Sequence, residues 1–370
     1  MAQNNPSTLS GTPRTIISVD AMGGDHGPAA VVAGIALSAA KHPEIGFILH
    51  GVSDELTPLV KRKPTLENRV EIRHTPDVIT MDDKPSQAMR NGQGSSMWST
   101  IEAVKNGDAS VAVSCGNTGA LMAISMIRLR KMPGVNRPAI ACLWPSRSKN
   151  GFNIMLDVGA DIRADENDLL QYATMGASYA RNGLGLDRPR VGLLNVGTEE
   201  TKGHPELKAA HELITSQAND DLDAFEFVGF VEGSDIPSDR VDVIVTDGFT
   251  GNVALKTGEG TASLISDFLR QAFKATPFAR ISALLAMTSL TRLSKRIDPR
   301  RVNGGVFLGL NGTVIKSHGS ADATGVSAAV NLAKKLADSG FSERLAARVA
   351  SVTPLREDTR NIDNGVTENT

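Results

Sequence analysis

The chain has 370 residues, of which 41% are hydrophobic and 22% are charged, and its formal net charge is −2 at pH 7. These values are typical of a soluble globular protein with one large domain or about two smaller ones, and they exclude a strong overall field that recruits nucleic acid. The 2 cysteines, Cys115 and Cys142, match no disulfide framework and no zinc-ligand spacing, which fits a reducing cytosolic compartment. We find neither a secretory signal in the polar N-terminus nor an apolar run of membrane-spanning length.

Strands and helices alternate along the first part of the chain. Short β-branched runs predict the strands, and Ala-rich or amphipathic segments predict the helices that follow them. Alternation with short connections indicates a mostly parallel sheet that helices cover on both faces. The strands are expected at residues 15–19, 46–50, 70–74 and 109–113, with helices that begin at residues 28 and 54 and helices that end near residues 105 and 129.

The second part of the chain combines further alternation with two expected hairpins. One contains an Asn-Gly turn within residues 304–319, and the other joins strands at 138–143 and 153–157. We expect a single α/β domain of two lobes at residues 15–350, between a disordered leader at 1–14 and a polar tail at 351–370. Its remaining elements are expected to be strands at residues 189–195, 225–230 and 241–245 and helices at 167–182, 322–336 and 341–349.

Three predicted strand-to-helix junctions carry glycines beside polar side chains. Backbone N–H groups at a helix N-terminus attract anions, and ligands of α/β sheets bind at the carboxyl ends of strands, so we expect a shared ligand crevice. A tight turn without a ligand is the alternative for the first junction. The junctions contain Gly23, Gly24, Asp25 and His26, then Asn117, Thr118 and Gly119, then Asn252 with Lys256 in the helix behind it.

Other polar residues of the chain have a structural and a functional interpretation. Ser95 and Ser96 either cap the helix that ends near residue 105 or form a phosphate-facing helix start. Lys202, in a Gly-flanked loop, is either an exposed lysine or a phosphate contact. Cys115 is either a small buried residue, the commoner case, or a nucleophile at a helix start.

Residues 278–297 form a basic amphipathic segment. Apolar residues recur there at close to helical spacing among arginines and lysines, and residues 271–297 contain no acidic side chain. Such a helix either packs its apolar stripe against a core or a dimer partner, or lies in an anionic membrane interface.

Several common motifs are absent from the sequence. The glycines at residues 23–27 do not form GxGxxG, and the chain contains no P-loop, no GxSxG and no HExxH. No basic run with interleaved aromatic residues is present, so we expect no nucleic-acid partner.

Eight blocks of the sequence together resemble, in order, the signature blocks of the bacterial phosphate acyltransferase family PlsX. The resemblance extends over about residues 16–349, almost the whole chain. The blocks are VDAMGGDHGP (19–28), SCGNTGALMA (114–123), MPGVNRPAIA (132–141), LDVGAD (156–161), LLNVGTEETKG (193–203), FVEGSDIP (230–237), DGFTGNVALKTGEG (247–260) and GGVFLGLNGTVIKSHGSAD (304–322).

This resemblance implies transfer of an acyl group from acyl carrier protein to inorganic phosphate, and the acyl phosphate would feed glycerol-3-phosphate acylation in phospholipid synthesis. It implies a Rossmann-like α/β fold related to phosphotransacetylases and isopropylmalate dehydrogenases, and a homodimer without cofactor or metal. It also implies peripheral contact with the inner face of the cell membrane, and with a membrane glycerol-3-phosphate acyltransferase, through an amphipathic helical hairpin at about residues 265–300. Membrane contact is then expected from Phe278, Ile281, Leu284, Leu285, Arg292 and Lys295.

The candidate residues suit this chemistry. Much of the phosphate is already a dianion at neutral pH, since its second pKa is about 6, and a thiol with a pKa of about 8.5 leaves readily. The site must therefore position the dianion beside the thioester and stabilise the oxyanion that forms. We expect phosphate among Lys202, Asn252, Lys256 and the N–H groups near Gly23 and Gly24.

The remaining candidates have supporting roles in this hypothesis. Asn117 and Thr118, next to Gly119, are candidates for oxyanion stabilisation, and Ser96 for phosphate binding. Asp25 and His26 would orient the loop or the thioester, and His318 or Lys316 would protonate the departing thiolate. Two rival hypotheses are an NAD-dependent oxidoreductase of the isopropylmalate dehydrogenase type and a non-catalytic membrane-docked scaffold.

Overall fold

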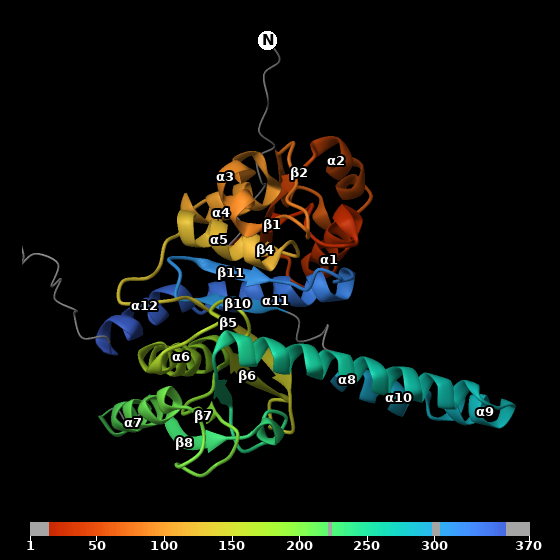
Figure 1. Ribbon diagram of the computed structural model, residues 1–370. Helices are drawn as coiled ribbons and strands as arrows, with labels where there is room; N and C mark the ends of the chain where they lie inside the picture. The colour runs from red at the N-terminus through yellow and green to blue at the C-terminus, as the bar shows by residue number, and fades with distance from the viewer. Residues whose placement is uncertain (1–14, 221–223, 298–303, 353–370) are drawn as a thin grey trace, which may run out of the picture.

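The computed structural model describes residues 15–220, 224–297 and 304–352, without the side chains of residues 294–297 and 352 (Figure 1). The expected leader at residues 1–14 lies outside this description. So does the expected polar tail, apart from residues 351 and 352, which still belong to helix α12.

Within the described residues, an 11-stranded sheet has the order β3-β2-β1-β4-β11-β10-β5-β6-β9-β7-β8. Strands β1 to β4 and β11 are parallel, and so are β6 to β9. The bounds are β1 Thr15–Asp20, β2 Ile45–Gly51, β3 Val70–His74, β4 Val111–Ser114, β5 Ala139–Pro145, β6 Phe152–Leu156, β7 Arg190–Leu194, β8 Glu226–Val231, β9 Val243–Val245, β10 Gly305–Leu308 and β11 Thr313–Lys316.

The two halves of the sheet meet at an antiparallel seam. Strand β10 is antiparallel to both β11 and β5, and β5 is also antiparallel to β6. The seam consists of the two hairpins that the sequence predicts, which confirms the expectation of a mostly parallel α/β sheet with two hairpins inserted.

Helices cover both faces of the sheet (Figure 1). One apolar core lies under α1, α6, α7, α11 and α12, and the second lies under α4, α5 and the first turns of α8. The bounds are α1 Gly27–Lys41, α2 Ser53–Lys61, α3 Pro85–Asn91, α4 Ser96–Lys105, α5 Thr118–Arg128, α6 Glu166–Ser178, α7 Pro205–Asp220, α8 Gly248–Lys274, α9 Pro277–Leu285, α10 Met287–Ile297, α11 Ala323–Asp338 and α12 Phe341–Val352.

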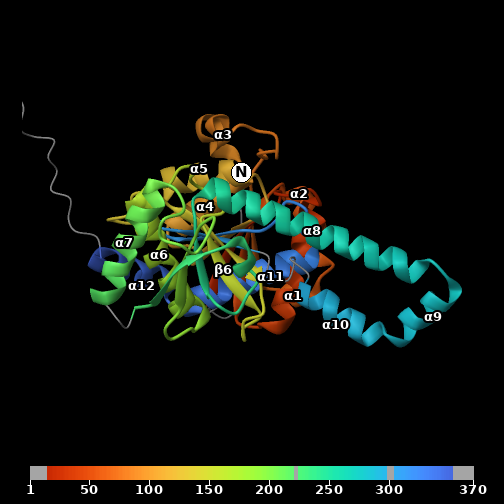
Figure 2. The same ribbon diagram turned by 60° about the horizontal axis from the view of Figure 1, so that its bottom comes forward.

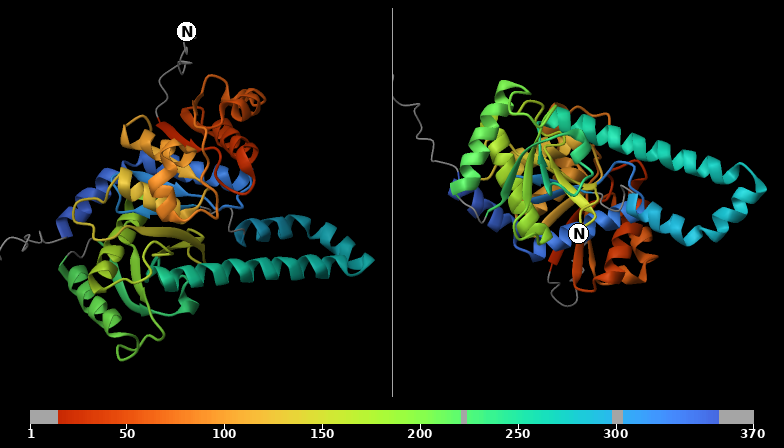
Figure 3. Two further views of the ribbon diagram at one scale, coloured as in Figure 1. Left: turned by 45° about the horizontal axis from the view of Figure 1, so that its top comes forward. Right: turned by 90° about the horizontal axis from the view of Figure 1, so that it is seen from below.

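Helices α8, α9 and α10 form an arm that projects from the body, with α9 at its tip, as Figure 2 and both views of Figure 3 show. The prediction of one continuous helix over residues 278–297 is wrong, because α9 ends at Leu285 and α10 begins at Met287. Phe278 and Leu285 are 82% and 84% exposed. Ile281, Leu284 and Arg292 are also exposed, while the side chain of Lys295 lies outside the described residues. No helix among the described residues is both long and apolar enough to cross a membrane.

Candidate active site

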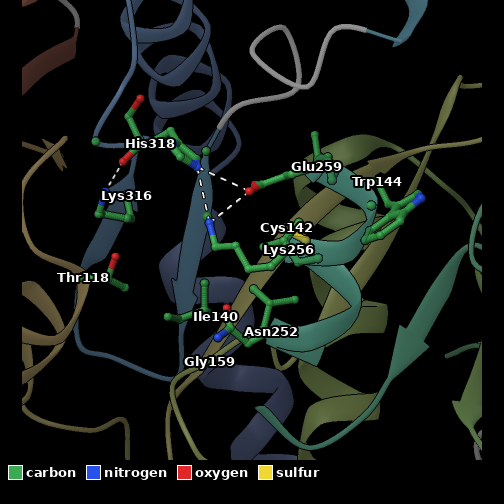
Figure 4. A pocket seen from close by; sticks show the side chains of 18 of the residues that line it. Thr118, Ile140, Cys142, Trp144, Gly159, Asn252, Lys256, Glu259, Lys316 and His318 are labelled. Carbon is green, nitrogen blue, oxygen red and sulfur yellow. Dashed lines mark hydrogen bonds and ion pairs between the residues drawn. The ribbon is translucent and has the colours of Figure 1, made fainter. Parts of the chain in front are cut away.

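A cavity of about 510 Å³ lies at the seam between the two halves of the sheet (Figure 4). Its size is within the range of small-molecule sites, roughly 300–1,000 Å³. Segments from both halves line it: the start of α5, strand β5, the loop after β6, the first turns of α8, the start of β10 and the end of β11. From the predicted site residues it gathers Thr118, Gly119, Asn252, Lys256, Lys316 and His318.

A glycine at the start of β10 keeps this space open. Gly305 pairs with Lys316 of β11, and Val306 pairs with Ala141 of β5, so Gly305 lies between Lys316 and Cys142. Both Gly304 and Gly305 line the cavity. A Cβ on Gly305 would lie 2.9 Å from the cavity-lining side chain of Ile140, so glycine there leaves the space open, whereas a Cβ on Gly304 would point toward Leu332 and Ile315. The seam therefore has a gap above β10, with a cation on one side and the apolar strand β5 on the other.

Three side chains that can carry charge meet at the mouth of the cavity. The Lys256 Nζ lies 3.0 Å from the Glu259 Oε2 and 3.4 Å from the His318 Nε2, and the His318 Nε2 lies 3.5 Å from the same Glu259 oxygen (Figure 4). Burial raises the pKa of Glu259, but hydrogen bonds from His318 and Lys256 outweigh it, so the net shift is downward. Glu259 is thus a carboxylate that holds two potential cations together.

Lys316 is a second kind of cation, because its amine is buried. Lys316 is only 8% exposed, and its Nζ donates to the Cys115 carbonyl at 3.3 Å and to the Ser317 carbonyl. Burial lowers the pKa of Lys316 to about 8. A buried ammonium group that hydrogen-bonds to carbonyl oxygens and lines a cavity is a favourable place for an anion.

The first turn of α8 is positioned by close packing of glycines. The side chain of Asp247 caps the helix. A Cβ on Gly251 would lie 1.9 Å from the Asp157 carbonyl oxygen, so only glycine permits this approach. The packing brings Asn252 against Gly159, and both residues line the cavity.

Helix α5 presents its N-terminus to the cavity through Thr118 and Gly119. Asn117, expected to stabilise an oxyanion, has a different role. Its Oδ1 accepts from the Ala120 N–H and its Nδ2 donates to the Met81 and Asp83 carbonyls, each at 2.9 Å. The side chain caps α5 and ties a loop to it, and it does not line the cavity.

The first glycine junction borders the cavity without lining it. A Cβ on Gly23 would lie 2.6 Å from the Asp20 Oδ2, and Gly24 has φ +94°, so both glycines are needed for a close turn. The Asp25 N–H donates to the Gly319 carbonyl at 2.8 Å, and Gly319 is part of the lining. Asp25 and His26 are exposed at this rim. The structure thus favours the turn interpretation for these glycines.

Ser95 and Ser96 both have structural roles. Ser95 caps α4 by accepting from the Trp98 N–H, which confirms the capping interpretation. Ser96 is buried and donates to the Asp20 Oδ1 at 2.7 Å, while Ser114 donates to the Oδ2 of the same carboxylate. The phosphate-facing interpretation of Ser96 is therefore wrong, because its hydroxyl holds Asp20 inside the protein.

Lys202 is a further predicted phosphate contact that the structure does not bring into the cavity. It lies in the loop after β7, its side chain is 50% exposed, and its Nζ pairs with Glu199 at 2.8 Å. Cys115 is buried, and burial raises the pKa of its thiol, so the structure favours the small-residue interpretation. Cys142 does line the cavity, but burial raises its pKa to about 12, which keeps the thiol protonated.

Sequence reasoning missed Glu259, Trp144, and the glycines that open the seam. Glu259 lies one turn after Lys256 in α8, and this i,i+3 spacing is a signal that could have identified it. Trp144 and the pair Gly304 and Gly305 give no such local signal, since only the pairing of β10 with β5 brings them to the site.

Comparisons with known proteins agree with the resemblance of the sequence blocks. A family model described as "Fatty acid synthesis protein" matches residues 15–344. A relative from Dinoroseobacter shibae named "Phosphate acyltransferase" is 73% identical over 342 residues, which cover 92% of this chain and 88% of the relative. A relative of the same name from Ruegeria sp. strain TM1040 is 68% identical over 358 residues, covering 97% and 95%.

Solved structures extend the comparison to the fold. A phosphotransacetylase from Streptococcus pyogenes superimposes with a TM-score of 0.56 at 17% identity, covering 89% of this chain and 96% of that one. The EutD phosphotransacetylase from Staphylococcus aureus gives 0.55 at 13% identity, covering 90% and 95%. These likenesses confirm the expected phosphotransacetylase-like fold. The sequence relatives identify the family: the chain belongs to the phosphate acyltransferases, a family of acyltransferase enzymes.

Proposed function

We propose that the chain transfers a long-chain acyl group from acyl carrier protein to inorganic phosphate, forming acyl phosphate for glycerol-3-phosphate acylation. The observation that carries this proposal is one cavity with cations on one side and apolar strand β5 on the other. Such a cavity suits a reaction between a small anion and a fatty acyl thioester.

Phosphate would bind among Asn252, Lys256 and Lys316, beside the N-terminus of α5. Lys256 would contact the phosphate by giving up part of its ion pair with Glu259, because a dianion attracts the ammonium group more strongly than one carboxylate does. The α5 terminus, where Thr118 and Gly119 line the cavity, adds the positive end of a helix dipole.

In the reaction, a phosphate oxygen attacks the thioester carbon, so that a C–O bond forms and the C–S bond then breaks. Thr118 and the α5 terminus would stabilise the tetrahedral oxyanion. The thiolate takes a proton from His318, whose Nε2 lies 3.5 Å from the Glu259 carboxylate. Because phosphate is already largely a dianion, no separate base is required.

The partners of this reaction are also proposals. Asp25 and His26, exposed at the rim beside Gly319, would orient the thioester arm of the carrier protein. Lys202 would reach phosphate only if the loop after β7 closed over the cavity. The arm would hold a homodimer at the inner face of the cell membrane, near the glycerol-3-phosphate acyltransferase that uses the product.

Thiol release from acyl carrier thioester, followed at several phosphate concentrations, tests the phosphate site. We expect Asn252→Ala and Lys256→Gln each to raise the KM for phosphate by about tenfold or more, since each removes a charged or polar contact to a dianion. Lys202→Ala should leave that KM unchanged, because Lys202 pairs with Glu199 outside the cavity lining.

Arg270→Gln is the matched control for Lys256→Gln. Arg270 pairs with Asp267 at i,i+3 spacing on the same helix, 2.8 Å apart, but outside the cavity lining. Wild-type phosphate KM in both Asn252→Ala and Lys256→Gln would contradict the proposed site. An absence of phosphate-dependent thiol release from the wild-type protein would contradict the proposed function.

A further inference from the structure

Strand β5 presents a row of apolar side chains to the cavity. Ile140, Cys142 and Trp144 all line it, and alternate residues of a strand share one face of the sheet. The row spans about 13 Å at the strand rise of roughly 3.3 Å per residue. The protonated thiol of Cys142 makes the middle of this row a small apolar surface.

Trp144 closes the row against helix α8. A Cβ on Gly258 would lie 2.4 Å from the Cη2 atom of the Trp144 ring and 2.6 Å from its Cζ2 atom. The indole therefore packs directly on the backbone of α8, and only glycine at position 258 leaves room for it. Figure 4 shows Trp144 on the far side of Glu259 from Lys316 and Thr118.

The backbone that carries Trp144 is firmly held. Trp144 pairs with Asn153 across the β5–β6 hairpin. The Asn153 Nδ2 donates to the Ile236 carbonyl at 2.8 Å and to the Ser238 carbonyl at 2.9 Å inside the protein. These bonds fix the backbone from which the indole extends.

The geometry also sets a path from the reacting group to this wall. Lys316 and Cys142 lie on either side of Gly305, about 10 Å apart at the usual strand spacing. Between them the cavity floor is glycine. A chain attached to a carbonyl near Lys316 can therefore cross Gly305, meet Cys142 and follow the apolar row to Trp144 and Leu255.

We infer that Trp144 and Gly258 form the wall that sets which acyl-chain lengths the enzyme accepts. This inference rests on the proposed function, because it assigns the acyl subsite of the same cavity. Residues of α8 thus serve both substrates: Asn252 and Lys256 face the anion, and Gly258 supports the wall met by the chain.

Tryptophan fluorescence tests the contact without any turnover. The chain has 2 tryptophans, Trp98 and Trp144, so a Trp98→Phe protein reports on Trp144 alone. Trp98 lies in helix α4 and is absent from the cavity lining. The probe is S-hexadecyl pantetheine, an unreactive thioether, with S-ethyl pantetheine as the short control. We expect a saturable change in emission with the long probe and none with the short one.

Chain-length profiles test the assigned role. We expect Trp144→Ala to raise the kcat/KM ratio of stearoyl to myristoyl thioester by about tenfold or more, because the stearoyl chain is four methylenes longer and even one methylene buried in an apolar pocket is worth about that factor. Gly258→Leu pushes a side chain into the wall and should shift preference toward shorter chains. Trp144→Phe, which keeps an aromatic ring, should lie between wild type and Trp144→Ala.

The outcomes separate this inference from the proposed function. Unchanged Trp144 emission with the long probe, or unchanged chain-length ratios in active Trp144→Ala and Trp144→Phe proteins, would overturn the assignment of the wall. A saturable emission change in a protein that releases no thiol with phosphate would support the acyl subsite and reject the proposed reaction.

Discussion

Lys316 is a residue at which the stability of the fold and the proposed phosphate site have opposite requirements. Its native pKa is about 8, below its usual 10.5, so the unfolded chain binds more protons between these pH values and stability rises with pH across that window. Below about pH 8, the buried ammonium group of Lys316 lowers the free energy of unfolding by about 3 kcal/mol. We expect Lys316→Met to raise the Tm at neutral pH and to lower phosphate-dependent activity strongly.

Thermal unfolding followed by circular dichroism, at neutral pH and again near pH 10, checks this prediction. The stability gain of Lys316→Met should shrink at the higher pH, where the native amine is already neutral. Lys335→Met is the matched control, since Lys335 is exposed on α11 and its replacement should change stability by less than about 0.5 kcal/mol. A Lys316→Met protein less stable than wild type at both pH values would contradict this account.

The polar candidates show which residues can be predicted from sequence alone. Asn252 and Lys256 follow a strand and a glycine-rich turn, so local patterning identifies them. Asn117 lies in the same kind of pattern, but its side chain caps α5 and hydrogen-bonds to the loop before it. Local patterning does not reveal which hydrogen bonds a side chain makes within the fold. Lys202 illustrates the same limit, since the pattern does not show that Glu199 pairs with it.

At the scale of elements, the start of α8 depends on a glycine contact that a matched pair of variants can test. Gly251→Ala places a Cβ 1.9 Å from the Asp157 carbonyl oxygen, so the helix must shift and carry Asn252 with it. We expect a loss of about 1–3 kcal/mol in stability and a raised phosphate KM. Denaturant unfolding and the thiol-release assay measure the two effects.

Gly260→Ala is the control for this helix, because a Cβ there meets nothing within 4 Å. Alanine is the better helix former, so this variant should be as stable as wild type or more stable by up to about 1 kcal/mol. If Gly251→Ala matched Gly260→Ala in both stability and phosphate KM, close packing would not be what positions Asn252.

The sequence predicts most strands to within a residue or two, but it misses α3 and α7. Helix α7 buries only Ala210, Ile214 and Ala218, a narrow stripe of mostly small residues in a polar segment. Helix α3 buries Ala88 alone, so neither helix has a strong amphipathic pattern. Core strands such as β2 are buried along their whole length and give continuous apolar runs, which is why they are easier to find.

For the whole molecule, the decisive feature is the seam where β10 pairs with β5. Each hairpin can be predicted from its own residues, but their pairing joins residues 139–141 to residues 306–308. No local pattern encodes such a distant contact. The cavity forms at this pairing, which explains why the sequence gives several of its polar residues and none of the glycines that open it.

The exposed arm leads to a prediction about the whole protein at a lipid surface. Phe278, Ile281, Leu284 and Leu285 gather at its tip around α9, in a stretch without acidic residues. We expect the protein to sediment with anionic phosphatidylglycerol vesicles, and less so at high salt, because apolar burial and charge attraction act together. The double substitution Phe278→Asp and Leu285→Asp should weaken binding by about tenfold or more, since each buried apolar side chain contributes about 1.5–3 kcal/mol.

Leu37→Asp provides the control, because Leu37 is an exposed leucine of α1, on the body and outside the arm. It should bind vesicles like wild type. Circular dichroism shows whether the doubly substituted arm stays helical, and sedimentation velocity shows whether it changes the oligomeric state. Unchanged vesicle binding by the double variant would reject the arm as the lipid contact. If the double variant changed its oligomeric state but bound vesicles like wild type, these apolar side chains would instead belong to an interface with a second copy of the chain. Exposed apolar patches of this kind mark interaction sites.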